Sequence, residues 1–313
     1  MSDEKRLTRR ETTMAVAGLA GAAAVGGALT LGARPDSAAT RQESSMNPNR
    51  MPMAFVPHGG GPWPFVDVGF GPKDQEQRLR EYLVSLSRVP KTKPKALLVI
   101  SAHWEERVPT VMTNPKPPML YDYSGFPPES YEVQWPAPGD PVLAKRVRAL
   151  LETAGLPSAE DAARGFDHGA FVPLKLAFPN AEVPTVQLSL KAGLDPKEHL
   201  AIGRALAPLR DEGVFLLGSG MTFHNLRAFF NGGGGPVAEA FDGWLRETMK
   251  QPRAERDARL SDWARAPAAR AAHPREEHLL PLMVIAGAAG DEVASIPYAD
   301  LYVDLRLSAY HFG

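Results

Sequence analysis

The 313-residue sequence contains no cysteine. Disulfides, thiolate zinc sites, iron–sulfur clusters and a cysteine nucleophile are therefore excluded, and histidine and carboxylate remain as candidate metal ligands. An excess of one charge is also missing, because 35 basic residues face 36 acidic ones. This balance leaves no electrostatic footprint for nucleic acid, and we expect no nucleic-acid partner.

Long apolar runs are scarce, and the one considered as a membrane-directed segment lies near the N-terminus, from about Met14 to Leu31. Arg9-Arg10 precedes this run, and Ser37-Ala38-Ala39 follows it as a plausible cleavage site of small residues. We interpret residues 1–39 as a twin-arginine-like export signal. Thr12-Thr13 stand where this type of signal usually has a Phe-Leu pair.

A disordered tail or a membrane anchor are the alternatives for this segment. The run is short and rich in Gly and Ala, which favours export over anchoring. We therefore expect a periplasmic or otherwise exported protein without a stable membrane span in its mature form. An inactive signal would leave the protein cytoplasmic. Residues 40–51 are polar and are interpreted as a linker.

Residues 52–313 alternate short apolar runs with segments of helical spacing, which predicts a single domain of α/β class. We expect a sandwich with a central, mostly mixed sheet flanked by helices. Strands are predicted at residues 53–56, 97–100, 183–190, 214–217 and 299–308, the last as an edge or closing strand. Helices are predicted at residues 74–89, 140–154, 196–210, 236–249, 253–264 and 276–289. Residues 108–139 are rich in Pro, Tyr and Phe, and we interpret them as a lid or pocket wall.

Five of the eight histidines lie at predicted strand or helix ends or in loops. They are His58 in Pro-His-Gly-Gly-Gly-Pro, His103 after the apolar run 97–100, His168 in Asp-His-Gly, His224 after Gly-Ser-Gly, and His278 beside Glu277. Each alone could be an ordinary hydrogen-bonded histidine. Together they indicate a metal site, because neutral imidazoles suit zinc or iron and Glu277 adds a carboxylate.

The other three histidines have plainer interpretations. His199 lies on a polar helix and is expected to be solvated at the surface. His311 is expected to pack in the C-terminal tail, and His273 with Pro274 is interpreted as a helix entry. Asp167 is a candidate for orienting the ring of its neighbour His168, although sequence neighbours often point apart.

Two other motifs, for an esterase and for a phosphate site, are incomplete in this sequence. His58-Gly59-Gly60-Gly61 matches an esterase oxyanion-hole signature, but the segment around Ser219 lacks both outer glycines of the required Gly-x-Ser-x-Gly turn. Residues 232–235 are four glycines without a following Lys-Ser/Thr, so they predict a flexible loop and not a phosphate site. The His-Glu-x-x-His pattern of common metalloproteases is also missing from the sequence.

The motifs occur in the order seen in DODA-type extradiol ring-cleavage dioxygenases, and the sequence from Pro52 to Gly313 resembles that family throughout. These enzymes belong to the class III superfamily, whose type is the catalytic subunit of protocatechuate 4,5-dioxygenase. The resemblance rests on Pro57–Pro62, Ser101–Trp104, Asp167–Leu174, Gly218–Leu226 and His273–Leu282, and on the Tyr-Asp-x-x-Gly-Phe-Pro and Pro-Ala-Pro-Gly-Asp segments. It implies one catalytic domain over residues 52–313 and a non-haem metal: Fe(II) in the active form, with Zn(II) possible.

The resemblance also assigns roles to residues. His58 and His103 correspond to two metal ligands, and we choose His278 as the third, with Glu277 as the alternative. His224 corresponds to the acid/base residue and is close enough to serve as an additional ligand. His168 corresponds to the histidine that contacts substrate or dioxygen. Trp104, Phe171 and Tyr123 are candidate pocket walls, with ordinary core aromatics as the equal alternative.

The implied activity is cleavage of a catechol-type ring, DOPA-like or related, by O2 to a ring-opened semialdehyde. Three facial protein ligands leave positions for both catechol oxygens and dioxygen, and a histidine of near-neutral pKa suits the proton transfers. A zinc-binding hydrolase or a non-catalytic zinc protein on the same scaffold is the alternative. Neither the particular catechol nor the oligomeric state follows from the sequence.

Overall fold

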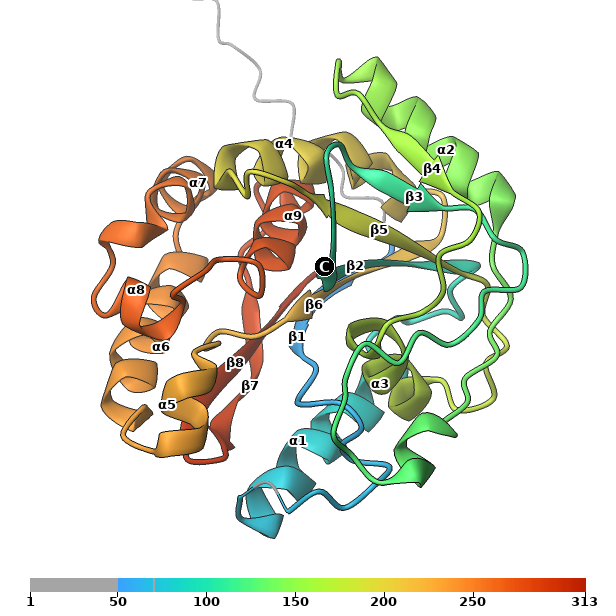
Figure 1. Cartoon of the computed structure of the whole chain (residues 1–313). Coiled ribbons are helices and arrows are strands. Elements are labelled where there is room, and N and C mark those ends of the chain that lie inside the picture. Colours follow the sequence, from blue (N-terminus) through green and yellow to red (C-terminus); the bar gives the residue numbers. More distant parts are fainter. Residues whose placement is uncertain (1–49, 70) are drawn as a thin grey trace, which may run out of the picture. The chain divides into compact units, whose positions relative to one another are not determined.

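The computed structural model describes residues 50–69 and 71–313, and the predicted export signal lies outside them. In the described part, helices flank a mixed eight-stranded sheet, which confirms the predicted α/β class (Figure 1). The strand order is β4-β3-β5-β2-β6-β1-β8-β7. Among the helices of residues 50–313, none is long and apolar enough to cross a membrane.

The middle of the sheet consists of four parallel strands, β5, β2, β6 and β1, and the antiparallel pairs lie toward its two edges. The strands are β1 Met53–Pro57, β2 Ala96–Glu106, β3 Thr110–Met112, β4 Ala159–Asp161, β5 Thr185–Lys191, β6 Val214–Gly220, β7 Ser295–Tyr302 and β8 Leu305–Phe312.

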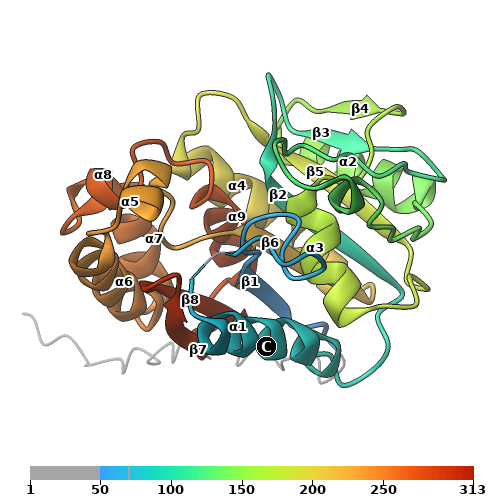
Figure 2. The same ribbon diagram turned by 60° about the horizontal axis from the view of Figure 1, so that its bottom comes forward.

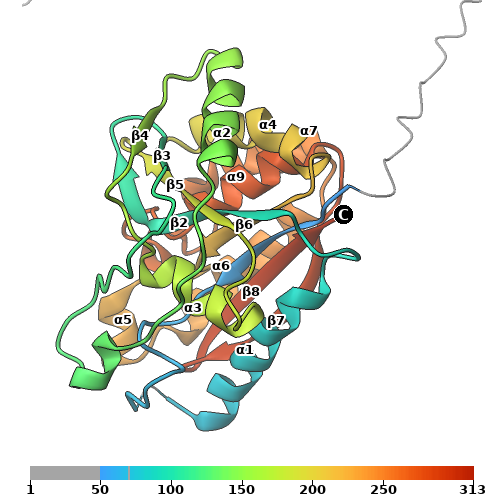
Figure 3. The same cartoon turned by 90° about the vertical axis from the view of Figure 1, so that its right-hand side faces the viewer.

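Helices lie on both faces of the sheet (Figure 2; Figure 3). The α-helices are α1 Lys73–Ser85, α2 Pro141–Thr153, α3 His168–Ala177, α4 Pro196–Leu206, α5 Leu226–Asn231, α6 Gly235–Met249, α7 Arg253–Ser261, α8 Ala269–Ala272 and α9 Leu280–Ala289. Short 3-10 turns cover Leu86–Arg88, Pro128–Tyr131, Ala207–Arg210 and Trp263–Arg265.

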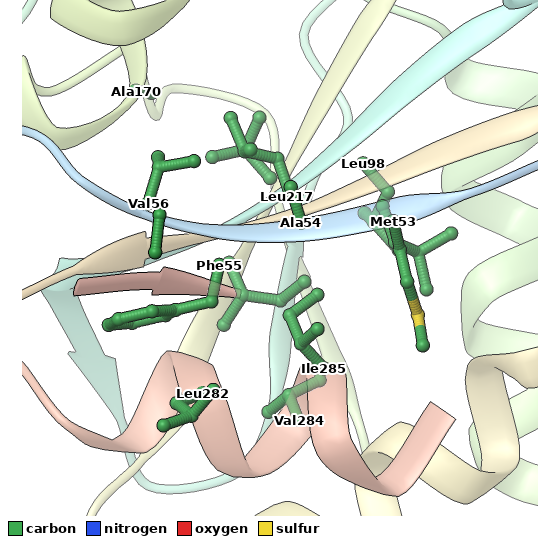
Figure 4. Close-up of a cluster of buried hydrophobic side chains, with 14 of the residues drawn as sticks. Met53, Ala54, Phe55, Val56, Leu98, Ala170, Leu217, Leu282, Val284 and Ile285 are labelled. Atoms are coloured by element: carbon green, nitrogen blue, oxygen red, sulfur yellow. The ribbon is translucent and has the colours of Figure 1, made fainter. Parts of the chain in front are cut away.

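Strand β1 shows why the central strands are apolar without alternation. Its side chains point alternately to the two faces, so Phe55 faces α9 while Val56 faces the side of Ala170 in α3 (Figure 4). Both faces are covered, and every residue of β1 is buried. Helix α9 packs against both the sheet and α4, which explains why it is apolar all round.

The predicted helix 276–289 is wrong at its start, because α9 begins at Leu280. Pro281 lacks an N–H and is tolerated only in the first turn of a helix, so the helix cannot extend upstream through it. Residues 276–279 form a turn instead, in which Leu279 N–H donates to the Glu276 carbonyl at 2.8 Å. His278 therefore lies in a turn before the helix.

The single strand predicted at residues 299–308 is also wrong. Strands β7 and β8 form a hairpin whose turn residues, Val303 and Asp304, both have positive φ of 53° and 60°. A two-residue turn of this kind usually carries Gly or Asn, and Val303 hides the signal. The edge position is correct, because β7 is the last strand of the sheet.

His199 is fully buried, so its predicted surface position is wrong. Its Nδ1 lies 2.8 Å from the Asp195 carbonyl, and its Nε2 accepts from the Lys191 N–H at 3.1 Å. The polar neighbours in the sequence occupy other faces of α4, while His199 faces inward and connects the helix to the end of β5. The prediction for His311 is confirmed, because its Nε2 packs 2.8 Å from the Tyr82 hydroxyl.

Three further elements lie where loops were expected. Asp167 accepts the Ala170 N–H at 3.1 Å and so caps α3, which starts at His168. Pro173 inside this helix conceals it in the sequence. The long segment 108–139 contains the short strand β3 and the 3-10 turn Pro128–Tyr131, and is otherwise irregular.

Candidate active site and metal centre

Three adjacent parallel strands deliver the first residues of the site to one edge of the sheet. His58 directly follows β1, His103 lies near the end of β2, and β6 ends at Gly220, four residues before His224. The carboxyl ends of parallel strands meet at one edge, and open α/β sheets place their ligands there. The register pairs Pro57 with Gly220, so the ends of β1 and β6 are level.

His278 reaches the same edge through the turn before α9. Met221 N–H donates to the His278 carbonyl at 2.9 Å. A Cβ on Gly220 would lie only 2.1 Å from that carbonyl oxygen, so a larger residue at this position would push the turn away. The glycine that ends β6 thereby allows His278 to face His103.

The Nε2 atoms of His58, His103 and His278 converge. The Nε2 of His103 lies 3.1 Å from that of His58 and 3.2 Å from that of His278. Ligand nitrogens about 2.0–2.1 Å from one metal ion are roughly 2.8–3.0 Å apart at octahedral angles and roughly 3.3–3.4 Å apart at tetrahedral angles. These three nitrogens are therefore spaced so that they could hold one metal ion.

The other ring nitrogens have partners that fix the tautomers. Ser219 Oγ donates to the Gly169 carbonyl, so it accepts the Nδ1–H of His58 at 3.0 Å. The Nδ1 of His278 lies 3.0 Å from Glu277 Oε1, and that of His103 lies 3.4 Å from Asp122 Oδ2. With the protons on Nδ1, the three converging Nε2 atoms present lone pairs, as metal ligation requires.

Burial also keeps these rings neutral. The loss of water lowers the pKa of His58, His103 and His278 well below the usual histidine value, and repulsion from neighbouring histidines lowers each further. An imidazole must be neutral to bind a metal. Near neutral pH, protons therefore compete little with a metal ion for these nitrogens.

His224 and His278 share one carboxylate. Glu277 Oε1 lies 3.0 Å from the Nδ1 of each ring, and the rings stack with centroids 3.3 Å apart and an interplanar angle of 17°. Burial would raise the pKa of Glu277, but the bond from His224 and other contacts give a net lowering. Glu277 thus acts as a common acceptor, and in this geometry His278 and not Glu277 faces His103.

His168 lies beside His103, with the two ring centroids 3.9 Å apart. Its Nδ1 and its backbone N–H both bind Asp122 Oδ1, at 2.8 and 3.0 Å. Burial would raise the pKa of Asp122, but its contacts with His168 and His103 lower it to about 2. Asp122 therefore orients His168, whereas the neighbouring Asp167 binds Ser101 Oγ and caps α3.

The glycine loop after His58 packs closely on the ring of His168. A Cβ on Gly61 would lie 2.8 Å from Cβ and Cγ of His168, closer than real side chains approach. The glycine at position 61 therefore lets the Pro-His-Gly-Gly-Gly-Pro loop lie directly against His168.

The five histidines open into one cavity of about 240 Å³. Apart from these histidines, its lining consists of glycines, aromatic and aliphatic side chains, and Asn225: Gly59, Gly60, Gly61, Tyr123, Phe126, Met221, Phe223, Leu226, Phe229, Phe230 and Tyr302. Tyr123 and Phe126 come from the segment 108–139, consistent with its interpretation as a pocket wall. Trp104 and Phe171 are buried but do not line the cavity.

All five histidines chosen from the sequence meet here. Within the described residues, two groups could hold a metal ion: His58, His103 and His168, and His224, Glu277 and His278. The contact between His103 and His278 joins them. Sequence reasoning missed Asp122 and the role of Ser219. Asp122 lies in a loop without periodicity, and Ser219 was tested only as a nucleophile.

Comparisons with known proteins agree with this site. Residues 52–306 match the family described as the catalytic LigB subunit of aromatic ring-opening dioxygenase. The dioxygenase tasH of Hapsidospora irregularis is 37% identical over 84% of this chain and 85% of its own length. The 4,5-DOPA dioxygenase extradiol of Beta vulgaris is 41% identical over 76% of this chain and 86% of its own.

A further relative, the 4,5-DOPA dioxygenase extradiol of Escherichia coli, is 34% identical over 80% of this chain and 90% of its own length. The crystal structure of an uncharacterized Escherichia coli K12 protein superposes with a TM-score of 0.69 at 31% identity, covering 84% of this chain and all of that one. These matches favour a dioxygenase over the zinc hydrolase or non-catalytic zinc protein. The chain belongs to the LigB family of aromatic ring-opening dioxygenases and is a metal-dependent extradiol ring-cleavage enzyme.

Proposed function

We propose that the protein cleaves the ring of a catechol with O2, using Fe(II) held by His58, His103 and His278. The observation that carries the proposal is the convergence of three neutral Nε2 atoms beside two further histidines. When bound, the metal supplies coordination sites for the catechol oxygens and for dioxygen, and electrons for oxygen activation. Zn(II) suits the same three imidazoles and is the expected competitor.

His224 is the proposed acid/base residue. Its Nδ1 is bound to Glu277, so its Nε2 is the atom that takes a proton from a catechol hydroxyl and returns it later. The Glu277 carboxylate stabilises the imidazolium that forms in between. The stacking of His224 on His278 places this base beside a proposed ligand.

His168 is the proposed contact for the oxygen species or the substrate. Asp122 accepts the Nδ1–H of His168, which leaves the Nε2 of His168 open for a reactant. This nitrogen and the Nε2 of His224 are the two polar atoms beside the three proposed ligands. The apolar lining of the cavity excludes bulk water, which strengthens hydrogen bonds from His168 and His224 to the reactants.

Anaerobic loading with Fe(II), followed by oxygen and a panel of catechols, tests the proposal. We expect a yellow ring-opened semialdehyde, and none from His103→Ala. An absence of turnover with every catechol, despite stoichiometric iron, would contradict it. Higher specific activity after Zn(II) loading would contradict the choice of iron alone.

We also propose that residues 1–39 direct export through a twin-arginine route and leave a periplasmic catalytic domain beginning near residue 52. The support is Arg9-Arg10 ahead of the Gly/Ala-rich run. Replacing Arg9-Arg10 with Lys-Lys should retain the protein in the cytoplasm on cell fractionation. Unchanged localisation of that variant would exclude the twin-arginine route.

A further inference from the structure

The lining of the active-site cavity contains no charged side chain that could bind a charged substituent of the substrate. Among the described residues, none of the side chains that line it belongs to Lys, Arg, Asp or Glu. Asp122 and Glu277 are not part of the lining, and each is bound to a histidine nitrogen. Arg227 is exposed on α5 and is not part of the lining.

Two uncharged polar side chains of the lining, those of Asn225 and Tyr123, are hydrogen-bonded within the protein. The Asn225 amide donates to the Ala271 carbonyl at 2.8 Å and accepts the Ala228 N–H at 3.2 Å. The Tyr123 hydroxyl donates to the Ser130 carbonyl at 2.6 Å. The Tyr302 hydroxyl has no hydrogen-bond partner among the described residues, but other atoms cover it and a substrate does not reach it. Beyond the histidines and the backbone of Gly59–Gly61, the side chains open to a substrate therefore present mainly carbon.

The outer part of the cavity is exposed and apolar. Leu226 and Phe230 on α5 are 55% and 65% exposed, which is unusual for large hydrophobic residues. Phe229 of the same helix and Phe126 of the segment 108–139 line the cavity with them. Exposed apolar residues that gather beside a cavity mark a surface for an apolar ligand.

We infer that the preferred substrate is a catechol whose ring carries an uncharged alkyl or aryl substituent, in contact with Phe126, Leu226, Phe229 and Phe230. This inference rests on the proposed function, which places the catechol hydroxyls at the histidines. A carboxylate or ammonium on the substituent would lose water without gaining a partner, whereas an alkyl or aryl group gains by leaving water. An amino-acid catechol such as DOPA is therefore a poor fit.

Anaerobic calorimetry on the Fe(II)-loaded protein tests the preference independently of turnover. The probes are 4-ethylcatechol, 3-(3,4-dihydroxyphenyl)propionate and L-DOPA, which share the catechol ring and differ in charge. We expect 4-ethylcatechol to bind at least about 10-fold more tightly than either charged compound. Equal or tighter binding of L-DOPA or the propionate would overturn the inference.

A charge placed at the mouth provides the second arm. Phe230→Lys should shift the affinity ratio of the propionate to 4-ethylcatechol by about 10-fold toward the propionate. Val293→Lys, at an apolar residue that is 55% exposed outside the cavity, serves as the matched control and should leave the ratio unchanged. The same ratio in Phe230→Lys and the wild type would overturn the assignment of this surface.

Turnover separates this inference from the proposed function. Admission of oxygen should give ring-opened product from 4-ethylcatechol with a higher kcat/KM than from L-DOPA. A higher kcat/KM for L-DOPA overturns the substituent preference and leaves ring cleavage intact. No product from any catechol overturns ring cleavage, and with it the assignment of these ligands as substrates.

Discussion

The base and the mouth of the cavity are built in opposite ways. At the base, His58, His103 and His278 are held by strand ends and a turn, and the Nδ1 of each has a polar partner. At the mouth, the six-residue helix α5 has no buried residue, and Leu226 and Phe230 are exposed. The comparison separates two tasks: the base fixes geometry for chemistry, and the mouth offers a surface that can vary with the substrate.

The largest effect is expected at the base. His103→Ala removes the Nε2 that lies between those of His58 and His278. We expect loss of bound metal and a fall in kcat/KM of about 10³-fold or more. Metal analysis and turnover of a catechol measure both. Retention of stoichiometric metal with normal turnover would show that His103 is not a ligand.

Substitutions in helix α9, which packs under the sheet, should lower the free energy of unfolding more than substitutions in helix α5 at the mouth. Leu282 in α9 is fully buried beneath the sheet, and Leu282→Ala should cost about 2–5 kcal/mol of unfolding free energy. Leu226→Ala in α5 should change it by no more than about 0.5 kcal/mol. Denaturant unfolding monitored by circular dichroism measures the difference. Similar losses in the two variants would mean that α5 is part of the folding core.

The partners of the ligands should matter less than the ligands themselves. Glu277→Gln weakens the acceptor shared by His278 and His224, and metal affinity should fall about 10- to 100-fold. Glu276→Gln is the matched control, because Glu276 pairs with Arg270 at 2.5 Å outside the histidine cluster. Competition with a chelator measures the affinity. Equal affinities for the two variants would exclude the positioning role of Glu277.

Acid sensitivity should also arise away from the site. Burial lowers the pKa of His311 to about 4, and its Nε2 lies 2.8 Å from the Tyr82 hydroxyl. Below pH 6.5 the unfolded chain binds a proton that folded His311 does not, so the free energy of unfolding decreases as the pH is lowered to about pH 4. At pH 5 this one group decreases the free energy of unfolding by about 2 kcal/mol.

Between pH 7 and 5, the free energy of unfolding of His311→Gln should decrease by about 2 kcal/mol less than that of the wild type. Denaturant titrations at each pH measure this difference. A constant offset at all pH values would reflect the lost contact with Tyr82 alone. An unchanged slope would show that His311 is protonated in the folded protein, which would contradict the neutral state expected of this half-buried ring.

The sequence by itself determined the class of fold and the set of site histidines. Apolar runs such as 97–100 identify strands that are buried on both faces, and histidines that follow such runs are carried to the same edge of a parallel sheet. His58 and His103 could be chosen on this local signal. The resemblance to a family added order and roles for His168, His224 and His278.

Tertiary structure alone decided which atoms face one another. Asp122 binds His168 from a loop 46 residues away, and Gly220 admits the turn that carries His278. His199 is buried although Lys197 and Glu198 precede it, because α4 turns that face inward. These outcomes depend on contacts between segments distant in the chain. Local pattern and propensity specify only which face of an element is apolar, and packing decides what meets it.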